Sequence, residues 1–266
     1  MFRGLAEQQS ADAELRSEGW TGLGIVQMTR GEYHPARISF LRAIRLDRRN
    51  AAAYYHLGLL YRDAPFGYNE AALEQFDIFV RLAAEASPRV QKVQRSVIPG
   101  LKESIARASA ERPGAAKRDS AASAKAQAAA EAAWAKRNYK TAKAKYQEAL
   151  TADALNHNAA KGLAKAWLKT DSGKTGKQKA FEYYRTACAL RPGAVADFLE
   201  AGKLAMQLGL PAQAAEIYSR ALAASPSSLD ATDGLIRAYR KSGGKERLAL
   251  ANAYQLYRDA LPKARK

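Results

Sequence analysis

Few residues in this chain are suited to redox, metal or nucleophilic chemistry. Cys188 is the single cysteine, which excludes a disulfide framework and a thiolate metal site. The three histidines, His34, His56 and His157, share no metal-ligand spacing, and no catalytic Ser/His/Asp order or carboxylate pair stands out. We therefore expect no enzymatic activity, no metal and no cofactor, and we interpret Cys188 as a buried structural thiol.

Long hydrophobic runs are missing as well. The chain has no run of about 18 apolar residues, so no transmembrane helix is predicted. Its first residues lack the apolar core of a signal peptide. A removed signal would leave the same sequence, so the compartment stays open between cytoplasm and periplasm.

Acidic residues are scarce relative to basic ones. The chain has 43 Lys and Arg against 26 Asp and Glu, a net charge of +17. Residues 1–118 hold 18 basic and 13 acidic residues, whereas residues 119–266 hold 25 and 13. Such a balance favours nucleic acid, anionic membranes or acidic proteins as partners. The alternative is that lysines merely keep an alanine-rich helical surface soluble.

What the sequence does contain is a repeated hairpin pattern, clearest in residues 17–50. This stretch of 34 residues predicts two short helices joined by a turn at Gly31-Glu32. Large and small residues alternate along one face of each helix, which allows two helices to approach closely. The residues at these positions are Trp20, Leu23 and Gly24 in the first helix, and Ala36, Phe40 and Ala43 in the second.

The same pattern recurs along most of the chain. A second copy follows at the 34-residue offset, with Tyr54, Leu57, Gly58 and Tyr61 at the first-helix positions. Four weaker copies cover residues 123–260. Between them, an apolar stripe from Val90 to Ile105, interrupted at Pro99-Gly100, predicts one or two helices that cap the first pair.

The spacing W-x2-L-G followed by A-x3-F resembles the tetratricopeptide repeat (TPR) family. Gln27 stands where the family has an aromatic residue, and Arg48 stands where proline is common. The resemblance implies an all-α fold, an α-solenoid of helix-turn-helix repeats wound into a right-handed superhelix. It covers residues 17–85 and 123–260.

Composition suggests a division of this solenoid into two lobes. Residues 1–107 are expected to form an N-terminal lobe of two repeats with capping helices. Residues 108–122, which contain Pro113-Gly114 and small residues, are expected to form a linker. Residues 123–266 are then a C-terminal lobe of about four repeats.

Proteins of this family bind partners on the concave face lined by the first helix of each repeat, and the resemblance implies the same role here. Projecting that face onto this sequence gives candidate partner-binding residues: Tyr55, Arg62, Trp134, Lys161, Lys165, Lys169, Lys203, Arg237 and Arg240. The aromatic residues among them are equally suited to packing against a neighbouring repeat. Lys161, Lys165 and Lys169 share one helix face, where they repel one another by roughly 0.2–0.5 kcal/mol per pair. An anionic partner would relieve this repulsion, as would Asp230 and Asp233 of the last repeat.

One subclass of the family grips acidic C-terminal tails with a carboxylate clamp. Lys161 matches its first position, but Lys165 and Glu200 stand where the clamp needs asparagine. The clamp is therefore not supported.

We interpret the chain as a non-enzymatic interaction scaffold or adaptor for a partner protein or peptide of acidic character, for example in the assembly of a larger bacterial complex. Two alternatives remain open at this point. One is a basic helical-repeat protein that binds RNA or other nucleic acid. The other is the interaction domain of a larger enzyme or regulator.

Overall fold

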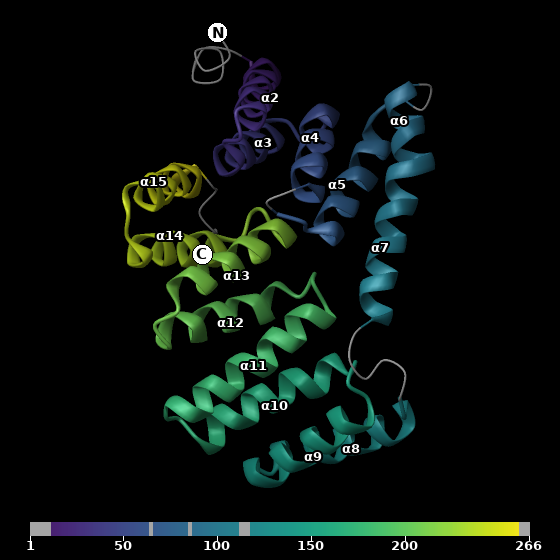
Figure 1. Ribbon diagram of the computed structural model, residues 1–266, viewed down its shortest axis with the longest axis vertical. Helices are drawn as coiled ribbons and strands as arrows, with labels where there is room; N and C mark the ends of the chain where they lie inside the picture. The colour runs from purple at the N-terminus through teal and green to yellow at the C-terminus, as the bar shows by residue number, and fades with distance from the viewer. Residues whose placement is uncertain (1–11, 64–65, 85–86, 112–117, 261–266) are drawn as a thin grey trace. The chain divides into compact units, whose positions relative to one another are not determined.

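A computed structural model describes residues 12–63, 66–84, 87–111 and 118–260, and these residues contain helices and no strand. The chain divides into two compact units, one made of Met1–Ala106 and Gly244–Lys266 and the other of Arg107–Gly243 (Figure 1). None of the described helices is long and apolar enough to cross a membrane. The helices of the first unit are α2 (Ala13–Thr29), α3 (Tyr33–Leu46), α4 (Ala51–Arg62), α5 (Asn69–Leu82), α6 (Pro88–Lys92), the π-helical turn η1 (Val93–Val97), most of α7 (Ile98–Ala110), and α15 (Lys245–Asp259).

The second unit is a stack of antiparallel helix pairs in which each helix packs on the next one in the chain (Figure 1). Its helices are α8 (Ser120–Ala135), α9 (Tyr139–Ala152), α10 (His157–Thr170), α11 (Lys174–Leu190), α12 (Val195–Gln207), α13 (Pro211–Ala224) and α14 (Leu229–Ser242). The prediction of an all-α solenoid of helix-turn-helix repeats is therefore confirmed.

Close contacts between a glycine and an aromatic ring occur within the pairs α2–α3, α4–α5 and α12–α13. A Cβ atom on Gly24 would lie 2.5 Å from the ring of Phe40, so only glycine lets α2 and α3 approach this closely. Gly202 faces the ring of Tyr218 in the same way, at 2.6 Å. These are the small and large positions that the sequence pattern pairs within one repeat. Gln27, the departure from the pattern, accepts a hydrogen bond of 2.6 Å from the hydroxyl of Ser39 instead of packing as an aromatic ring.

One hydrogen-bond network occurs in both units at an offset of 106 residues. Asn50 caps α4 by accepting from the Ala53 amide, and its side-chain amide donates to Ser17 and Thr21 of α2. Asn156 caps α10 by accepting from the Ala159 amide. The partners of its amide are Ser123 and Gln127 of α8. In each unit the serine hydroxyl in turn donates to a carbonyl of the second helix, at Ala43 and Ala149 respectively. A helix cap thus also ties one repeat to the next.

The last predicted repeat is divided between the units at Gly243 and Gly244. Both glycines have positive φ angles, 68° and 86°, which side chains disfavour. α14 packs on α13 in the second unit, whereas α15 packs on α3 in the first. The sequence placed 244–266 in the C-terminal lobe, and the structure differs because α15 supplies partners for a buried charge on α3.

That charge belongs to Arg37, which is 0% exposed. Its Nε donates to the hydroxyl of Tyr254 at 2.9 Å, and its guanidinium also lies over the rings of Phe66 and Tyr254. A buried guanidinium requires such partners, since desolvation without them costs several kcal/mol. The docking of α15 therefore completes the core of the first unit.

The segment after α5 is helical where the sequence predicted an interruption at Pro99-Gly100. The helix runs through both residues, and the stripe residues Val90, Val93 and Leu101 are buried. α6, η1 and α7 form one continuous helical run, and the π-helical turn η1 just before Pro99 accommodates a residue that has no N–H to donate. α7 and α8 also take in both ends of the expected linker, and residues 112–117 lie outside the described residues. The proposed boundaries at 107 and 123 stay a prediction.

Candidate functional site

A hollow of about 560 Å³ lies on the side of the second unit where the first helices of its hairpins gather. It is formed mainly by α8, α10 and α12, as the concave-face prediction requires. Four of the predicted partner-binding residues line it, namely Trp134, Lys161, Lys165 and Lys169. The other lining residues are Leu168, Tyr184, Ala196, Asp197, Leu199 and Glu200.

Asp197 is the electrostatic centre of this hollow, although the sequence did not single it out. Its side chain is 1% exposed, and it stands in the first turn of α12, where the helix dipole favours a negative charge. His157 Nε2 lies 2.6 Å from its Oδ2 and donates a hydrogen bond to that carboxylate oxygen. Lys161 Nζ lies 2.8 Å from Oδ1 and forms an ion pair with it, without hydrogen-bond geometry.

Lys161 is therefore engaged within the unit rather than free for a partner. It keeps 32% of its side chain exposed, but its charge balances a buried carboxylate. The internal relief expected from Asp230 and Asp233 for the α10 lysines comes from Asp197 instead. The hydrogen bond that Lys203 donates to Glu200 raises the pKa of this lysine, and the negative charge of Asp230 raises it further.

The remaining predicted lysines differ in how much of their charge is available. Lys203 donates to Glu200 at 2.7 Å. Lys169 is exposed, and its Nζ lies 5.9 Å from the centre of the Tyr139 ring. Lys165 is exposed and makes no ion pair or hydrogen bond among the described residues. The hollow thus offers Lys165 and Lys169 as available cations beside apolar side chains.

Of the two aromatic candidates, only Trp134 lines the hollow. Trp134 is half-buried and packs edge-on against Tyr139, with ring centres 5.0 Å apart. Tyr55 belongs to the first unit, where it packs against Phe76 and Phe79 and under the guanidinium of Arg89. Tyr55 therefore packs mainly on the second helix of its own repeat, and packing against a neighbouring repeat was the alternative expected for it.

The arginine candidates are not gathered at the hollow. Arg62 of the first unit binds the carboxylate of Asp63 through Nε and Nη2, at 2.7 and 3.0 Å. Arg237 and Arg240 are exposed on α14 in the second unit. Burial raises the pKa of the Tyr218 hydroxyl, and Arg237 beside it acts in the opposite direction.

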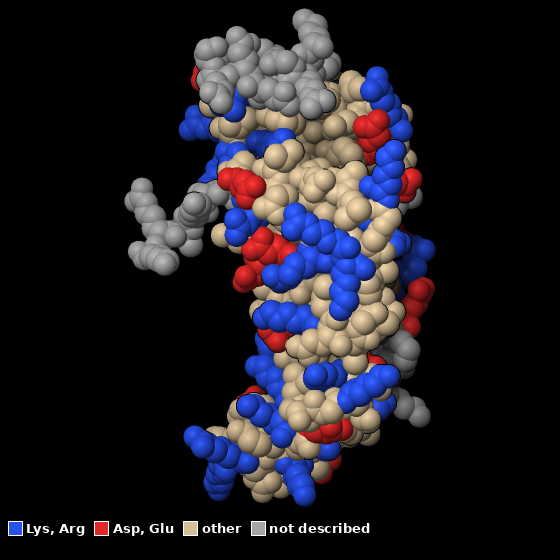
Figure 2. All heavy atoms as spheres, turned by 90° about the vertical axis from the view of Figure 1, so that its left-hand side faces the viewer, with Lys and Arg blue, Asp and Glu red and all other residues tan. Residues whose placement is uncertain are grey.

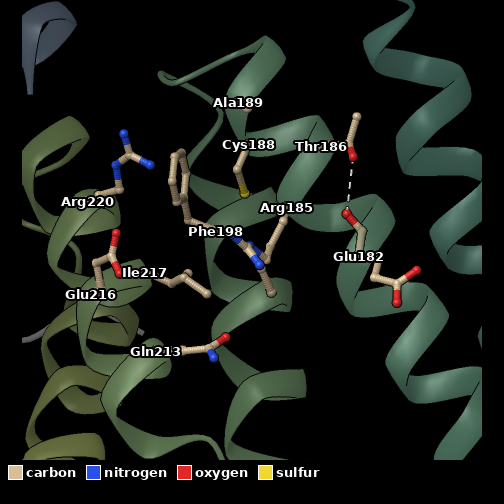
Figure 3. Close-up of a pocket in the computed structure, with 11 residues that line it drawn as sticks. Glu182, Arg185, Thr186, Cys188, Ala189, Phe198, Gln213, Glu216, Ile217 and Arg220 are labelled. Carbon is tan, nitrogen blue, oxygen red and sulfur yellow. Dashed lines mark hydrogen bonds between the residues drawn. The ribbon is translucent and has the colours of Figure 1, made fainter. Parts of the chain in front are cut away.

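A second hollow, of about 680 Å³, lies on α11, α12 and α13 and was not anticipated from the sequence. Figure 3 shows Cys188 and Phe198 beside each other here, with Glu182, Arg185, Glu216 and Arg220 around them. Cys188 is buried, as predicted, and burial together with Asp197 raises the pKa of its thiol to about 12. The thiol is therefore protonated and unreactive in the folded chain.

No cluster of three or more His, Cys, Asp or Glu residues suited to a metal occurs in the described part of the chain. The absence of enzymatic activity stays a prediction from the sequence.

Comparisons with known proteins found no matching family model and no similar sequence among curated proteins. Among solved structures, the first TPR of Spaghetti (RPAP3) bound to an HSP90 peptide is 19% identical, with a TM-score of 0.41, over 48% of this chain and 98% of that one. YrrB, a TPR protein with an unusual peptide-binding site, is 18% identical, with a TM-score of 0.42, over 83% and 93%. The TPR2AB-domain:pHSP90 complex of yeast Sti1 is 14% identical, with a TM-score of 0.35, over 96% and 89%.

The consecutive helix pairs and their glycine–aromatic contacts define a helical-repeat protein of the α-solenoid class. Small and large residues meet at the positions that the tetratricopeptide repeat pattern specifies, so the fold is similar to that of tetratricopeptide-repeat proteins.

Proposed function

We propose that the chain is a protein-interaction scaffold and that the hollow between α8, α10 and α12 binds an extended segment of a partner protein. The observation that carries this proposal is the pairing of apolar lining with an unpartnered cation. Leu168, Leu199 and Trp134 offer apolar contact, and Lys165 offers a charge without a partner among the described residues. A segment with alternating acidic and apolar side chains fits both.

Electrostatics favours an acidic segment over a basic one. Asp197 and Glu200 are the acidic residues of the lining, and both carry a lysine partner at 2.8 and 2.7 Å. Their charges are therefore neutralised locally, whereas those of Lys165 and Lys169 are not. A partner carboxylate placed between these two lysines would relieve their mutual repulsion across one helical turn.

The solved structures provide a parallel, since two of the three similar proteins are described as complexes with HSP90-derived ligands. This chain departs from the asparagine pattern of the carboxylate clamp. We therefore propose recognition of side-chain carboxylates within a segment, with no requirement for a free C-terminus.

The test is the affinity of the full chain for fluorescein-labelled peptides of about ten residues, measured by anisotropy. One peptide alternates Asp or Glu with Leu, a second has Lys for each acid, and a third has Ser for each Leu. We expect the first to bind most tightly. Lys165→Glu should weaken its binding by about tenfold, a loss of about 1.4 kcal/mol.

Lys125→Glu is the matched control, because Lys125 is another exposed lysine without a side-chain partner but lies outside the hollow. It changes the net charge equally. An equal loss of affinity in both variants, or no loss in Lys165→Glu, would refute the proposed groove.

A further inference from the structure

A second basic surface of the second unit lies outside the hollow, along the turns that join α8 to α9 and α10 to α11. Residues 132–143 and 168–181 hold eight Lys and Arg and a single acid, Asp171. Asp171 is occupied in the fold, where its Oδ1 accepts from the Gly173 amide at 2.8 Å. We call the surface the turn edge and define it by Lys136, Arg137, Lys140, Lys174 and Lys177.

The side chains of the turn edge are available to a ligand. Four of the five residues are exposed and Lys177 is half-buried. None of the five side chains makes an ion pair or hydrogen bond among the described residues. Figure 2 looks onto this side of the unit, and in its lower part Lys and Arg clearly outnumber Asp and Glu.

The two turns form one continuous surface. α9 packs on α10, and the Nζ of Lys169 at the end of α10 lies 5.9 Å from the ring centre of Tyr139 at the start of α9. The Nζ of Lys143 lies 3.9 Å from the ring centre of Trp167 and links the same two helices. Helices in such contact lie about 8–10 Å apart, so one extended ligand can span both turns.

The placement of these cations works against helix stability. α9 and α11 have no acidic residue in the first turn and instead carry Lys140 and Lys174 there. Cations at a helix N-terminus oppose the helix dipole, whereas a bound anion is favoured by it. A ligand with several negative charges would therefore relieve an unfavourable arrangement at two neighbouring helices.

Arg137 adds a second unfavourable feature. Its φ is 58°, and it occupies the turn position that Gly31 and Gly209, both with φ of 75°, occupy in other repeats. The turns are the same, since each of these residues donates its amide to the carbonyl three residues earlier. A side chain at this φ is strained, so the turn would be more stable with glycine. The cation is present despite that cost.

The chemistry of the turn edge favours nucleic acid over a membrane. The exposed large hydrophobic residues of the described chain are Leu15, Tyr33, Leu82, Leu248 and Leu256, and all of them belong to the first unit. The turn edge therefore has no apolar side chain to insert into a bilayer. It does have the half-buried ring of Tyr139 beside Lys140, and this ring packs edge-on against Trp134 of the hollow. Aromatic rings among lysines suit unpaired bases with phosphates on either side.

We propose that the turn edge binds the phosphate backbone of single-stranded nucleic acid, with Lys136, Arg137, Lys140, Lys174 and Lys177 as the phosphate contacts. Lysine contacts a phosphate as a point charge, so the binding has little sequence preference. These five cations lie outside the hollow proposed for a protein segment, and the two surfaces adjoin at Trp134 and Lys169.

The test is the binding of the full chain to a labelled oligouridylate of about 20 nucleotides over a series of salt concentrations. The triple variant Lys136→Glu, Lys140→Glu and Lys174→Glu should weaken binding by at least about tenfold at about 150 mM salt. Each phosphate contact adds about −0.7 to the slope of log affinity against log salt, so three lost contacts make the slope shallower by about 2. The matched control is Lys92→Glu, Lys102→Glu and Lys125→Glu, three exposed lysines outside the turn edge, which should retain binding.

Arg137→Gly tests the same surface without depending on whether the triple variant folds. Glycine suits the φ of this position, so the variant stays folded while one contact is lost, and the slope should fall by about 0.7. Unchanged affinity and slope in Arg137→Gly would overturn the assignment, as would equal losses in the triple variant and its control.

Three further ligands test the preference for a single strand, and one further variant tests where the strand binds. A duplex of the same length, vesicles rich in phosphatidylserine, and polyglutamate should each bind more weakly than the oligouridylate. Tighter binding of any of them would refute a single-strand site. Lys165→Glu should leave oligouridylate binding intact, and a loss equal to that of Lys174→Glu would place the strand in the hollow instead.

Discussion

Replacing Asn156 with alanine tests whether a single side chain ties two repeats together. The change removes the cap on the Ala159 amide, at 2.9 Å, and the two bonds from the side-chain amide to Ser123 and Gln127, at 2.9 and 3.0 Å. Loss of an N-cap costs about 1 kcal/mol, and each lost hydrogen bond costs about 0.5–1.5 kcal/mol net. Because Gln127 can turn to water, we expect a total loss of about 2–3 kcal/mol in the free energy of unfolding.

Asn156→Asp separates the cap from the link between repeats. The carboxylate still accepts from the Ala159 amide and is favoured at a helix N-terminus, but it cannot donate to Ser123 or Gln127. We expect this variant to lose about 1–2 kcal/mol, clearly less than Asn156→Ala.

Urea denaturation followed by circular dichroism measures both variants. Asn50→Ala serves as a parallel in the first unit, where Ser17 and Thr21 replace Ser123 and Gln127 as partners, and it should cost a similar amount. No loss for Asn156→Asp, or a loss below about 0.5 kcal/mol for Asn156→Ala, would show that the network does not link the repeats.

Three further expectations follow from individual side chains. Gly162→Ala would place a Cβ 2.4 Å from the Tyr146 ring and should cost about 1–3 kcal/mol in urea denaturation, whereas Gly100→Ala, with open space around it, should stabilise by about 0.5–1 kcal/mol; equal effects would contradict the close-packing account. Burial, aided by Arg37, lowers the pKa of His34 to about 3. Between the ordinary histidine pKa of about 6.5 and this value, the unfolded chain binds the proton and the folded chain does not, so stability falls as pH falls through that window. His34→Gln should reduce by about 1–2 kcal/mol the stability lost between about pH 7 and pH 5, and an unchanged pH profile would rule out the buried neutral imidazole. The Cys188 thiol, with its pKa raised to about 12, should react with a disulfide reagent only as fast as the second unit opens, and urea should accelerate the reaction; rapid modification of the folded chain would show that the thiol is accessible.

The sequence was sufficient for the repeat architecture because that architecture depends on residue size at short range. Gly24 and Phe40 are 16 residues apart in one hairpin, and their contact follows from the periodicity of two adjacent helices. Lys165 and Lys169 follow in the same way, since residues four apart share one face of a helix. The burial of Cys188 was also predictable from its place on an apolar helix face.

The partners of charged side chains were harder to predict. Asp197 lies 40 residues from His157 and 36 residues from Lys161, in the next repeat, and nothing in the sequence distinguishes it as the buried one of the two acids on α12. A sequence signal for it exists only in its position, in the first turn of a first helix, where an inward-facing carboxylate is unusual. For this reason Lys161 was predicted to be an available cation, whereas its charge is balanced by Asp197.

The sequence by itself determined the helical repeats, the positions where helices meet and the excess of positive charge, because all three depend on composition and local periodicity. The tertiary structure alone decided which cations keep their charge available and where α15 packs. Both are settled by contacts between residues far apart in the chain. Tyr254 accepts a hydrogen bond from Arg37 across 217 residues, because a buried guanidinium needs partners that offset its desolvation.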